Sequence, residues 1–349
     1  MTVDPAALAA LSAAVAAETA LAAWYLARVR MPRPPVGVYT GGDIAVLCAG
    51  VVLAPLLYTT LPAAAVSAVF GLVACLAVQF TLAPLLAATP LRATPWSWAA
   101  ALTATAATAL AALTGHPAAA RAGSDLMIAT AVVGVANLWT QSGLRSGHTA
   151  ALAAVLTGYD LAATTLTDTT TRFFEQVQDR PFAPLLALTG GPAPVAVGLG
   201  DLLLLVLYPL VAAKAHGRTA ATVAALVGLL TTSAVSACFA AGWLTSGFPL
   251  LTALGPLIVA QHLYWRRRTG GERTTAQWRE GHPLPLPLPS SVGHEPAAAL
   301  AAPVPDGTPP GTWLALADGR VLGTGPTPGH ARRDARRHGT DTPTTARLV

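Results

Sequence analysis

The stretch Gly198-Leu199-Gly200-Asp201 runs directly into Leu202-Leu203-Leu204-Leu205-Val206-Leu207, which places one carboxylate at the start of an apolar segment long enough to span a bilayer. A carboxylate at membrane depth costs about 2.5–3.5 kcal/mol on insertion scales, so it indicates a functional site with a partner. The predicted partner is Asp160, at the end of the preceding apolar segment. Each acid alone has a structural alternative, because Asp201 could cap a helix at the water line and either acid could line a transport cavity.

The pairing of these two acids follows from the antiparallel course of consecutive spanning segments. The end of one span lies beside the start of the next, so Asp160 and Asp201 are expected at similar depth near one membrane face. Two carboxyl groups about 3 to 6 Å apart in a low-dielectric site cannot both ionise, so they share a proton. Such a dyad contains one acid and one base, and it can activate water for amide hydrolysis.

The composition predicts a membrane protein. Of the 349 residues, 53% are hydrophobic and 11% are charged, with a mean hydropathy of +0.54, which is far too apolar for a soluble domain of this length. We therefore predict an all-α polytopic membrane protein with nine transmembrane helices within residues 1–268. The nine apolar segments are 6–28, 43–60, 62–88, 96–113, 125–141, 148–166, 198–213, 219–243 and 248–265.

Several polar residues near these spans have predicted structural roles. Glu18 is expected to face other helices, and Asn137 and Gln141 are expected to form interhelical hydrogen bonds. His216, after the seventh span, is expected to be a solvated residue at a helix terminus. Residues 168–180 have the pattern of a short helix at the membrane interface.

A short extended segment is predicted just before the seventh span. Residues 192–197 read Pro-Ala-Pro-Val-Ala-Val, and proline disfavours helix at the residue before it, while valine favours strand. Unpaired backbone at membrane depth is tolerated only where it lines a cavity or is covered. This segment could therefore pair with a substrate strand by β-augmentation.

The C-terminal part differs in composition from the spans. Residues 269–311 are predicted to form a Pro-rich linker. Residues 312–349 are predicted to be either a small ββα module or a disordered basic tail, in either case soluble. The ββα alternative has a hairpin turn at Asp318-Gly319 and a helix that begins near Thr327-Pro328.

Three motifs resemble the GxGD intramembrane aspartyl proteases, the presenilin and signal peptide peptidase group, in a bacterial-looking Ala/Leu-rich form. They are Tyr159-Asp160 in the sixth span, Gly198-Leu199-Gly200-Asp201 at the start of the seventh, and Pro249-Leu250-Leu251 at the start of the ninth. The last resembles the Pro-Ala-Leu element of the family. The flanks at 175–180 and 198–216 are similar to presenilin in particular.

The resemblance implies that Asp160 and Asp201 are the catalytic pair. It also implies that Gly198 and Gly200 permit close approach and that Leu199 touches the substrate. The ninth-span element, Pro249 to Leu251, is implied to shape the cleft. The implied cleft residues are Tyr159, Gly198, Leu199, Gly200, Pro249, Leu250 and Leu251. The ninth span departs from the family, since Leu250 replaces the expected alanine, and Pro256-Leu257 is a competing match.

The implied partners are membrane lipid and protein substrates with transmembrane helices, such as signal-peptide remnants or single-span proteins. No cofactor or metal is expected, and no nucleic-acid partner, because no basic patch is interleaved with aromatic residues. The short link at 168–194 predicts no self-cleavage there, unlike presenilins. Lys and Arg in the short loops predict an outside N-terminus and a cytoplasmic tail, in a bacterial plasma membrane.

Two other functions remain open from the sequence. The prepilin peptidases also contain a GxGD motif, but they usually have a lysine soon after its aspartate, and residues 202–207 contain none. The other is a catalytically silent membrane carrier or assembly protein that uses the acids for protons or partners.

Overall fold

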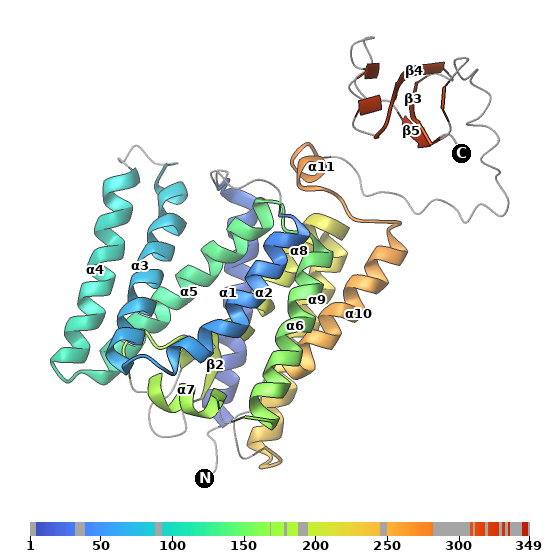
Figure 1. Ribbon diagram of the computed structural model, residues 1–349. Helices are drawn as coiled ribbons and strands as arrows, with labels where there is room; N and C mark the ends of the chain where they lie inside the picture. Colours follow the sequence, from blue (N-terminus) through green and yellow to red (C-terminus); the bar gives the residue numbers. More distant parts are fainter. Residues whose placement is uncertain are drawn as a thin grey trace. The chain divides into compact units, whose positions relative to one another are not determined.

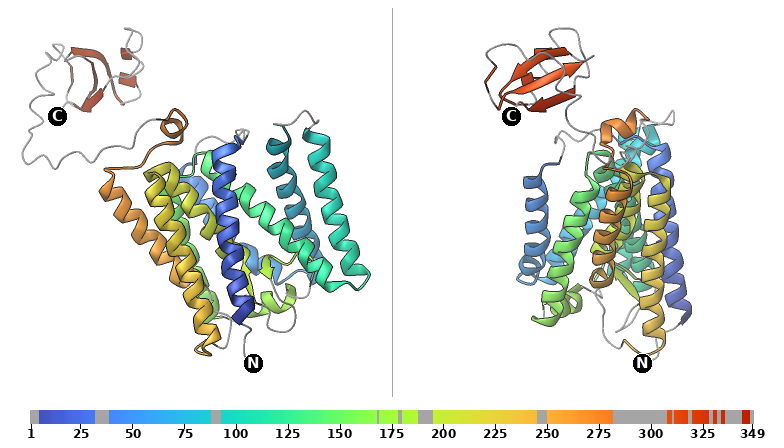
Figure 2. Two further views of the ribbon diagram at one scale, coloured as in Figure 1. Left: turned by 180° about the vertical axis from the view of Figure 1, so that it is seen from behind. Right: turned by 90° about the vertical axis from the view of Figure 1, so that its right-hand side faces the viewer.

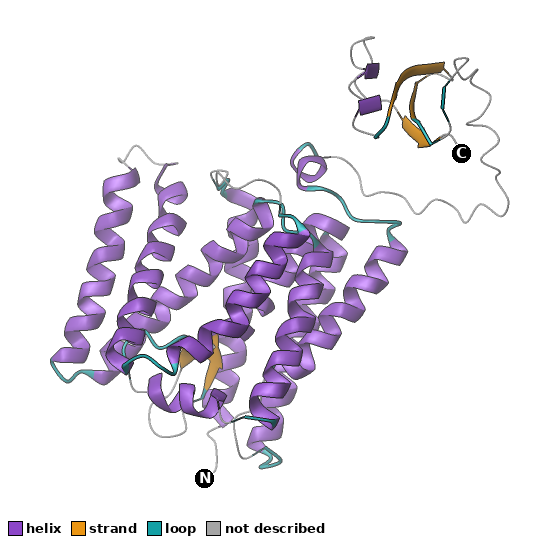
Figure 3. Cartoon of the chain, in the orientation of Figure 1, coloured by secondary structure: helices purple, strands orange, loops and turns teal. Residues whose placement is uncertain are grey.

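The computed structural model describes most of the chain, which divides into two compact units, Met1–Pro287 and Leu288–Val349. The first unit is almost entirely helical, whereas the second contains strands (Figure 3). The described residues are 5–31, 39–87, 93–167, 169–177, 180–187, 195–244, 250–281, 308–309, 311–317, 320–327, 330–331, 334–335 and 344–347.

The first unit is a bundle of long helices with a two-stranded sheet and the short helix α7 at one end (Figure 1). Helices α3 and α4 pack together on one side of the bundle, and α6 and α10 pack together on the other. The elements are α1 (Pro5–Arg28), α2 (Gly41–Tyr58), α3 (Ala63–Ala87), α4 (Ala93–Leu113), α5 (Pro117–Gln141), α6 (Ser146–Thr165), α7 (Thr169–Val177), β1 (Leu185–Ala187), β2 (Ala196–Gly198), α8 (Leu199–His216), α9 (Arg218–Ala240), α10 (Leu251–Arg268) and α11 (Thr275–Arg279).

Seven helices in the described part of the chain are long and apolar enough to cross a membrane: α1, α2, α3, α4, α5, α8 and α9. The chain is therefore an all-α integral membrane protein in this unit. Helices α6 and α10, the predicted sixth and ninth spans, belong to the same bundle but are less apolar. The reason is local, since α6 contains Ser146, His148 and Asp160, and α10 contains Gln261 and ends in three arginines.

Helix α8 is the centre of the bundle. It packs against α1, α5, α6 and α9. Of its 18 residues, 72% are buried inside the protein, compared with 6% of the residues of the peripheral α2. Its Leu202–Leu207 run is apolar on all sides, as expected for a helix surrounded by other helices. The position of Asp201 is thus determined by the most buried of the seven candidate spans in the described part of the chain.

The predicted interhelical roles of three polar residues are confirmed. Asn137 on α5 donates to the Ala22 carbonyl of α1 at 3.1 Å. Gln141 donates to the Val29 carbonyl and accepts from the Met31 amide, so it ties α5 to the segment that follows α1. Glu18 is buried among the helices.

The prediction for His216 is wrong, because this side chain is only 2% exposed. Its Nδ1 lies 3.1 Å from the Thr269 hydroxyl, in the segment that follows α10 and returns over the end of α8. The same segment supplies Arg273, whose guanidinium donates to the carbonyls of Ala213 and Lys214 and so caps the last turn of α8. His216 is therefore buried by a segment that lies 53 residues further along the chain, although the local sequence pattern predicted that it is solvated.

Lys214, in the last turn of α8, is buried as well. Its ammonium group donates to the carbonyls of Thr140 and Leu144, between α5 and α6, and to the Thr275 hydroxyl at 3.2 Å. Three acceptors match the three donors of an ammonium group, which is how a buried lysine is tolerated.

Gly255 allows α6 and α10 to approach each other closely. A Cβ atom at this position would lie 1.8 Å from the Thr157 hydroxyl oxygen and 3.1 Å from the Ala153 carbonyl oxygen. The hydroxyl of Thr157 also donates to the Leu251 carbonyl at 3.0 Å, so this close packing aligns the start of α10 with α6.

The second unit contains an antiparallel sheet in the order β4-β3-β5, with β3 (Trp313–Ala317), β4 (Arg320–Gly325) and β5 (Thr344–Arg347). Strands β3 and β4 correspond to the predicted hairpin, although its turn at 318–319 lies outside the described residues. Ala331 and Ala335, both in helical conformation, pack against Ala315 on the sheet. The sequence does not predict strand β5, and most of the predicted linker lies outside the described residues.

We expect Gly255→Ala to lower the stability of the bundle by about 1–3 kcal/mol, because the added methyl group collides with Thr157. The measurement is thermal unfolding of the purified protein in detergent. Gly50→Ala on α2 is the matched control, since a Cβ there meets nothing within 4 Å and alanine favours helix. Adding Thr157→Ala should restore part of the loss. Equal melting temperatures for Gly255→Ala and Gly50→Ala would show that this contact is unimportant.

Candidate active site

The site is built where a strand becomes a helix. Strand β2 pairs antiparallel with β1, with Leu185 opposite Gly198 and Ala187 opposite Ala196. The Leu199 amide then donates to the Pro184 carbonyl at 2.9 Å, so the pairing continues to the first residue of α8. Gly198 is both the last strand residue and the N-cap of α8, in extended conformation. The register of a small sheet therefore determines where Asp201 enters the bundle.

Asp201 lies in the first turn of α8 and is half-buried. One carboxyl oxygen, Oδ1, is enclosed and has no hydrogen-bond partner among the described residues. The other, Oδ2, lies 3.3 Å from the place where a Cβ of residue 198 would be. Gly198 thus leaves the carboxyl group room at close range. An enclosed carboxyl oxygen without a partner is costly to keep at membrane depth, and among the described residues the buried Glu18 of α1 has the same feature at its Oε1.

Asp160 reaches the same place from a different helix. It is half-buried in α6, one turn from the end of that helix, and its carboxyl group is close enough to interact electrostatically with that of Asp201. Helices α6 and α8 are in direct contact, with their acid-bearing ends at the same end of the bundle as α7 (Figure 1). The two predicted acids therefore lie at the same end of the bundle, on helices that are in contact.

A third helix contributes through its backbone. The Leu251 amide at the start of α10 hydrogen-bonds to the Asp201 carboxyl group, while the Leu251 carbonyl accepts from Thr157 of α6. Thr157 precedes Asp160 by three residues, so both lie on one side of α6. Leu251 consequently links the two acid-bearing helices. Sequence reasoning missed Thr157, because a threonine in an Ala/Thr-rich helix carries no distinguishing signal.

The ninth-span element can be compared with its competing match. Leu250 and Leu251 are both buried at the start of α10, and the Leu251 amide interacts with Asp201, whereas Pro256 is exposed and Leu257 is 39% exposed further along α10. This favours Leu250-Leu251 as the neighbour of the dyad. Pro249 lies outside the described residues.

The remaining predicted cleft residues lie next to the acids along the chain. Tyr159 is half-buried beside Asp160, and Leu199 is half-buried and packs against the main core. Gly200 is exposed, and a Cβ there would meet nothing within 4 Å. Unlike Gly198, Gly200 therefore has open space above it. No contact among the described residues requires glycine at this position.

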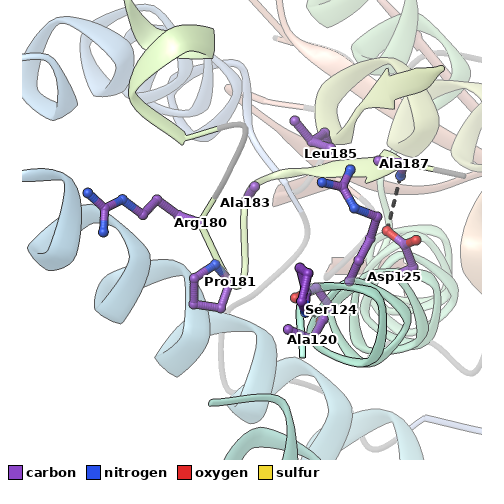
Figure 4. A pocket seen from close by; sticks show the side chains of 10 residues that line it. Ala120, Ser124, Asp125, Arg180, Pro181, Ala183, Leu185 and Ala187 are labelled. Atoms are coloured by element: carbon purple, nitrogen blue, oxygen red, sulfur yellow. Dashed lines mark hydrogen bonds between the residues drawn. The ribbon is translucent and has the colours of Figure 1, made fainter. Parts of the chain in front are cut away.

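The sheet is attached to α5 on the β1 side. The Asp125 carboxylate accepts a hydrogen bond from the Ala187 amide at 3.0 Å, and the Ser124 hydroxyl accepts one from the Phe182 amide at 3.0 Å. Figure 4 shows Asp125 and Ser124 side by side on α5, beneath the segment that leads into β1. Phe182 has φ 60°, a strained value for a bulky residue, so this turn depends on its contacts.

A small cavity lies at this attachment, between Ala120, Ser124 and Asp125 on α5 and the Arg180 to Ala187 segment (Figure 4). Its volume is about 160 Å³. Typical ligand pockets have volumes of roughly 300–1,000 Å³. We therefore regard it as part of the support of the sheet.

Helix α7 forms a wall at the same end of the bundle. Its Gln176 side chain donates to the Leu61 carbonyl at 2.7 Å, in the turn between α2 and α3. Phe173 stacks on Tyr58 with ring centroids 6.1 Å apart, and Val177 is buried against β1. The short helix predicted at 168–180 is thus present as α7 and is held against the bundle. Within the described residues, no three His, Cys, Asp or Glu side chains could together hold a metal ion.

We expect Asp125→Leu to loosen the sheet, because the Ala187 amide loses its acceptor. Hydrogen–deuterium exchange of the 185–187 amides should then become at least about tenfold faster, the loss of roughly one hydrogen bond. Asp125→Asn is the matched control, since its side-chain oxygen can still accept. Equal exchange in the parent and in Asp125→Leu would show that Asp125 does not hold β1.

Comparisons of the chain with protein-family models, with curated proteins and with solved structures gave no match.

Proposed function

We propose that the chain is an intramembrane aspartyl protease that hydrolyses peptide bonds within transmembrane segments. The observation that supports this most is the electrostatic interaction between Asp160 of α6 and Asp201 of α8, inside a bundle of membrane-spanning helices. Two acids this close, one with an enclosed and unpaired oxygen, are expensive to keep in lipid unless they act together. The pair fits the requirement for an acid and a base in amide hydrolysis.

The chemistry needs only the dyad and water. One carboxylate takes a proton from water as the oxygen forms a bond to the peptide carbonyl carbon, and the other, protonated carboxyl group donates to the carbonyl oxygen. The resulting gem-diol breaks its C–N bond when the carboxyl group that took the water proton donates it to the leaving nitrogen, while one diol hydroxyl returns its proton to the other carboxylate. The dyad then again shares a single proton. No residue of the chain becomes covalently attached to the substrate.

The substrate has to be extended at the bond that is cut, because a helix conceals its backbone. Strand β2 offers a template, since within the described residues it pairs only with β1 and so has one strand edge left. It ends three residues before Asp201. A substrate strand added to β2 would therefore run toward the dyad, over the open space at Gly200.

We further propose that α6 and α10 cross the membrane together with the other seven long helices. They contain 20 and 18 residues and pack on each other, and the Ser146 hydroxyl of α6 lies 2.8 Å from a ring nitrogen of His262 on α10, with both side chains buried. Nine spans with the tail in the cytoplasm put the N-terminus outside. Single-span proteins or signal-peptide remnants of a bacterial plasma membrane are then the substrates.

Purified protein in liposomes should cleave a reporter that contains a single spanning helix, and Asp160→Asn and Asp201→Ala should each reduce the rate at least about 100-fold. Asp43→Asn is the matched control, a partly exposed acid in the first turn of α2, and should leave the rate unchanged. The products are measured by mass spectrometry, which also gives the cleaved bond. Cleavage that persists in Asp201→Ala would contradict the dyad. No cleavage by the parent would favour a carrier.

The proposed orientation has its own test. A fluorescent protein fused after Val349 should be fluorescent, and alkaline phosphatase fused there should be inactive, because the tail is cytoplasmic. The reverse fusions at the N-terminus serve as the control. Phosphatase activity at the C-terminus would reverse the orientation without affecting the dyad.

A further inference from the structure

A long groove runs along the outside of the bundle between α1 and α9, with α8 as its floor. Seen from behind, α1 and α9 lie side by side (Figure 2). The groove has a volume of about 860 Å³, within the range of roughly 300–1,000 Å³ for ligand pockets. Its walls consist mainly of small side chains, such as Ala20 and Ala23 on α1 and Ala221 and Ala225 on α9. Both walls belong to helices that are apolar enough to cross a membrane.

The groove is as long as one leaflet of a bilayer. On α1 it extends from Val15 to Ala27, which is about 18 Å at 1.5 Å per residue. On α9 it extends from Arg218 to Leu229, or about 17 Å. Half of the hydrocarbon thickness is about 15 Å. An acyl chain entering from one membrane surface would therefore fill the groove to its end.

One end of the groove is basic and aromatic. Arg218, Arg273 and Trp278 line it there, and the Arg30 guanidinium lies 5.1 Å from the centre of the Trp278 ring. Arg218 is exposed in the first turn of α9, where the helix dipole also favours an anion. Arg273 is held in place by the two α8 carbonyls that it caps. The positive charge is thus concentrated where an apolar slot opens toward the membrane surface.

We propose that this groove binds one anionic phospholipid, with an acyl chain between α1 and α9 and its phosphate against Arg218 and Arg273. The arginines at one end of the groove complement the charge of a phosphate, and the apolar part of the groove has the length of an acyl chain in one leaflet. Both features favour an anionic phospholipid. A tryptophan at the headgroup level is typical of a membrane interface. The site is separate from the dyad and does not depend on protease activity.

The lipid would contact the helix that carries Asp201. Leu205, one turn beyond Asp201, forms part of the groove floor, together with Pro209 and Leu210. A Cβ on Gly228 of α9 would come within 2.9 Å of Leu205 Cδ2, so α8 and α9 are already in tight contact at this depth. An acyl chain that fills the groove would complete the packing around α8.

The test is native mass spectrometry of the full chain in detergent, titrated with palmitoyl-oleoyl phosphatidylglycerol or with the phosphatidylcholine of the same chains. We expect one phosphatidylglycerol per chain, bound at least about fivefold more tightly than phosphatidylcholine. Arg218→Gln should lower the affinity for phosphatidylglycerol about fivefold. Arg267→Gln is the charge control, because Arg267 is an exposed arginine at the end of α10 that does not line the groove.

A second pair of variants tests the apolar part. Ala20→Phe fills the groove and should abolish the bound lipid, whereas Ala17→Phe, exposed on the same helix but outside the groove, should not. Thermal unfolding establishes that each variant is folded. Equal affinity for the two lipids, an equal loss in Arg267→Gln, or full binding by Ala20→Phe would overturn the proposal. So would a dimer of the chain that Ala20→Phe dissociates, since a second copy would then occupy the groove.

Discussion

The structure depends on how one central helix keeps two ionisable groups inside a bundle that lipid surrounds. Lipid supplies no hydrogen bonds, so polar groups at membrane depth must find partners within the protein. Helix α8 has Lys214 near its end, and that ammonium group is fully provided with carbonyl and hydroxyl acceptors. At its start, Asp201 receives the Leu251 amide and the neighbouring acid Asp160, but one of its oxygens is left without a partner among the described residues. One end of α8 has all its hydrogen bonds within the protein, and the other end is where we place the proposed chemistry.

The sequence predicted the features that depend on local pattern. Apolar runs of about 20 residues identified the long helices, and the order of the motifs identified Asp160 and Asp201, which lie on contacting helices at the same end of the bundle. The interhelical roles of Asn137 and Gln141 also followed, because an amide inside a span has few other partners.

Features that depend on contacts between residues far apart in the sequence could not be predicted from local pattern. Strand β1 has only three residues, Leu185–Ala187, and it exists because β2 pairs with it and Asp125 holds its last amide. His216 looked solvated because nothing near it in sequence shows that the segment after α10 folds back. Leu251 links α6 and α8 through its backbone amide and carbonyl, and a sequence pattern of side chains does not predict such backbone interactions. Composition also does not show that α6 and α10 pack together, with Ser146 and His262 buried between them.

The most direct test of the central claim is chemical cross-linking between the two acid positions in native membranes. Cys48, Cys75 and Cys238 are free thiols and would first be replaced by alanine. A chain with Asp160→Cys and Asp201→Cys should then be joined by a short bifunctional thiol reagent, detected as peptide linkage by mass spectrometry. The pair Leu161→Cys and Asp201→Cys, with the first thiol on the exposed side of α6, should not be joined. Equal linkage of both pairs, or none in the first pair, would show that the two acids do not meet.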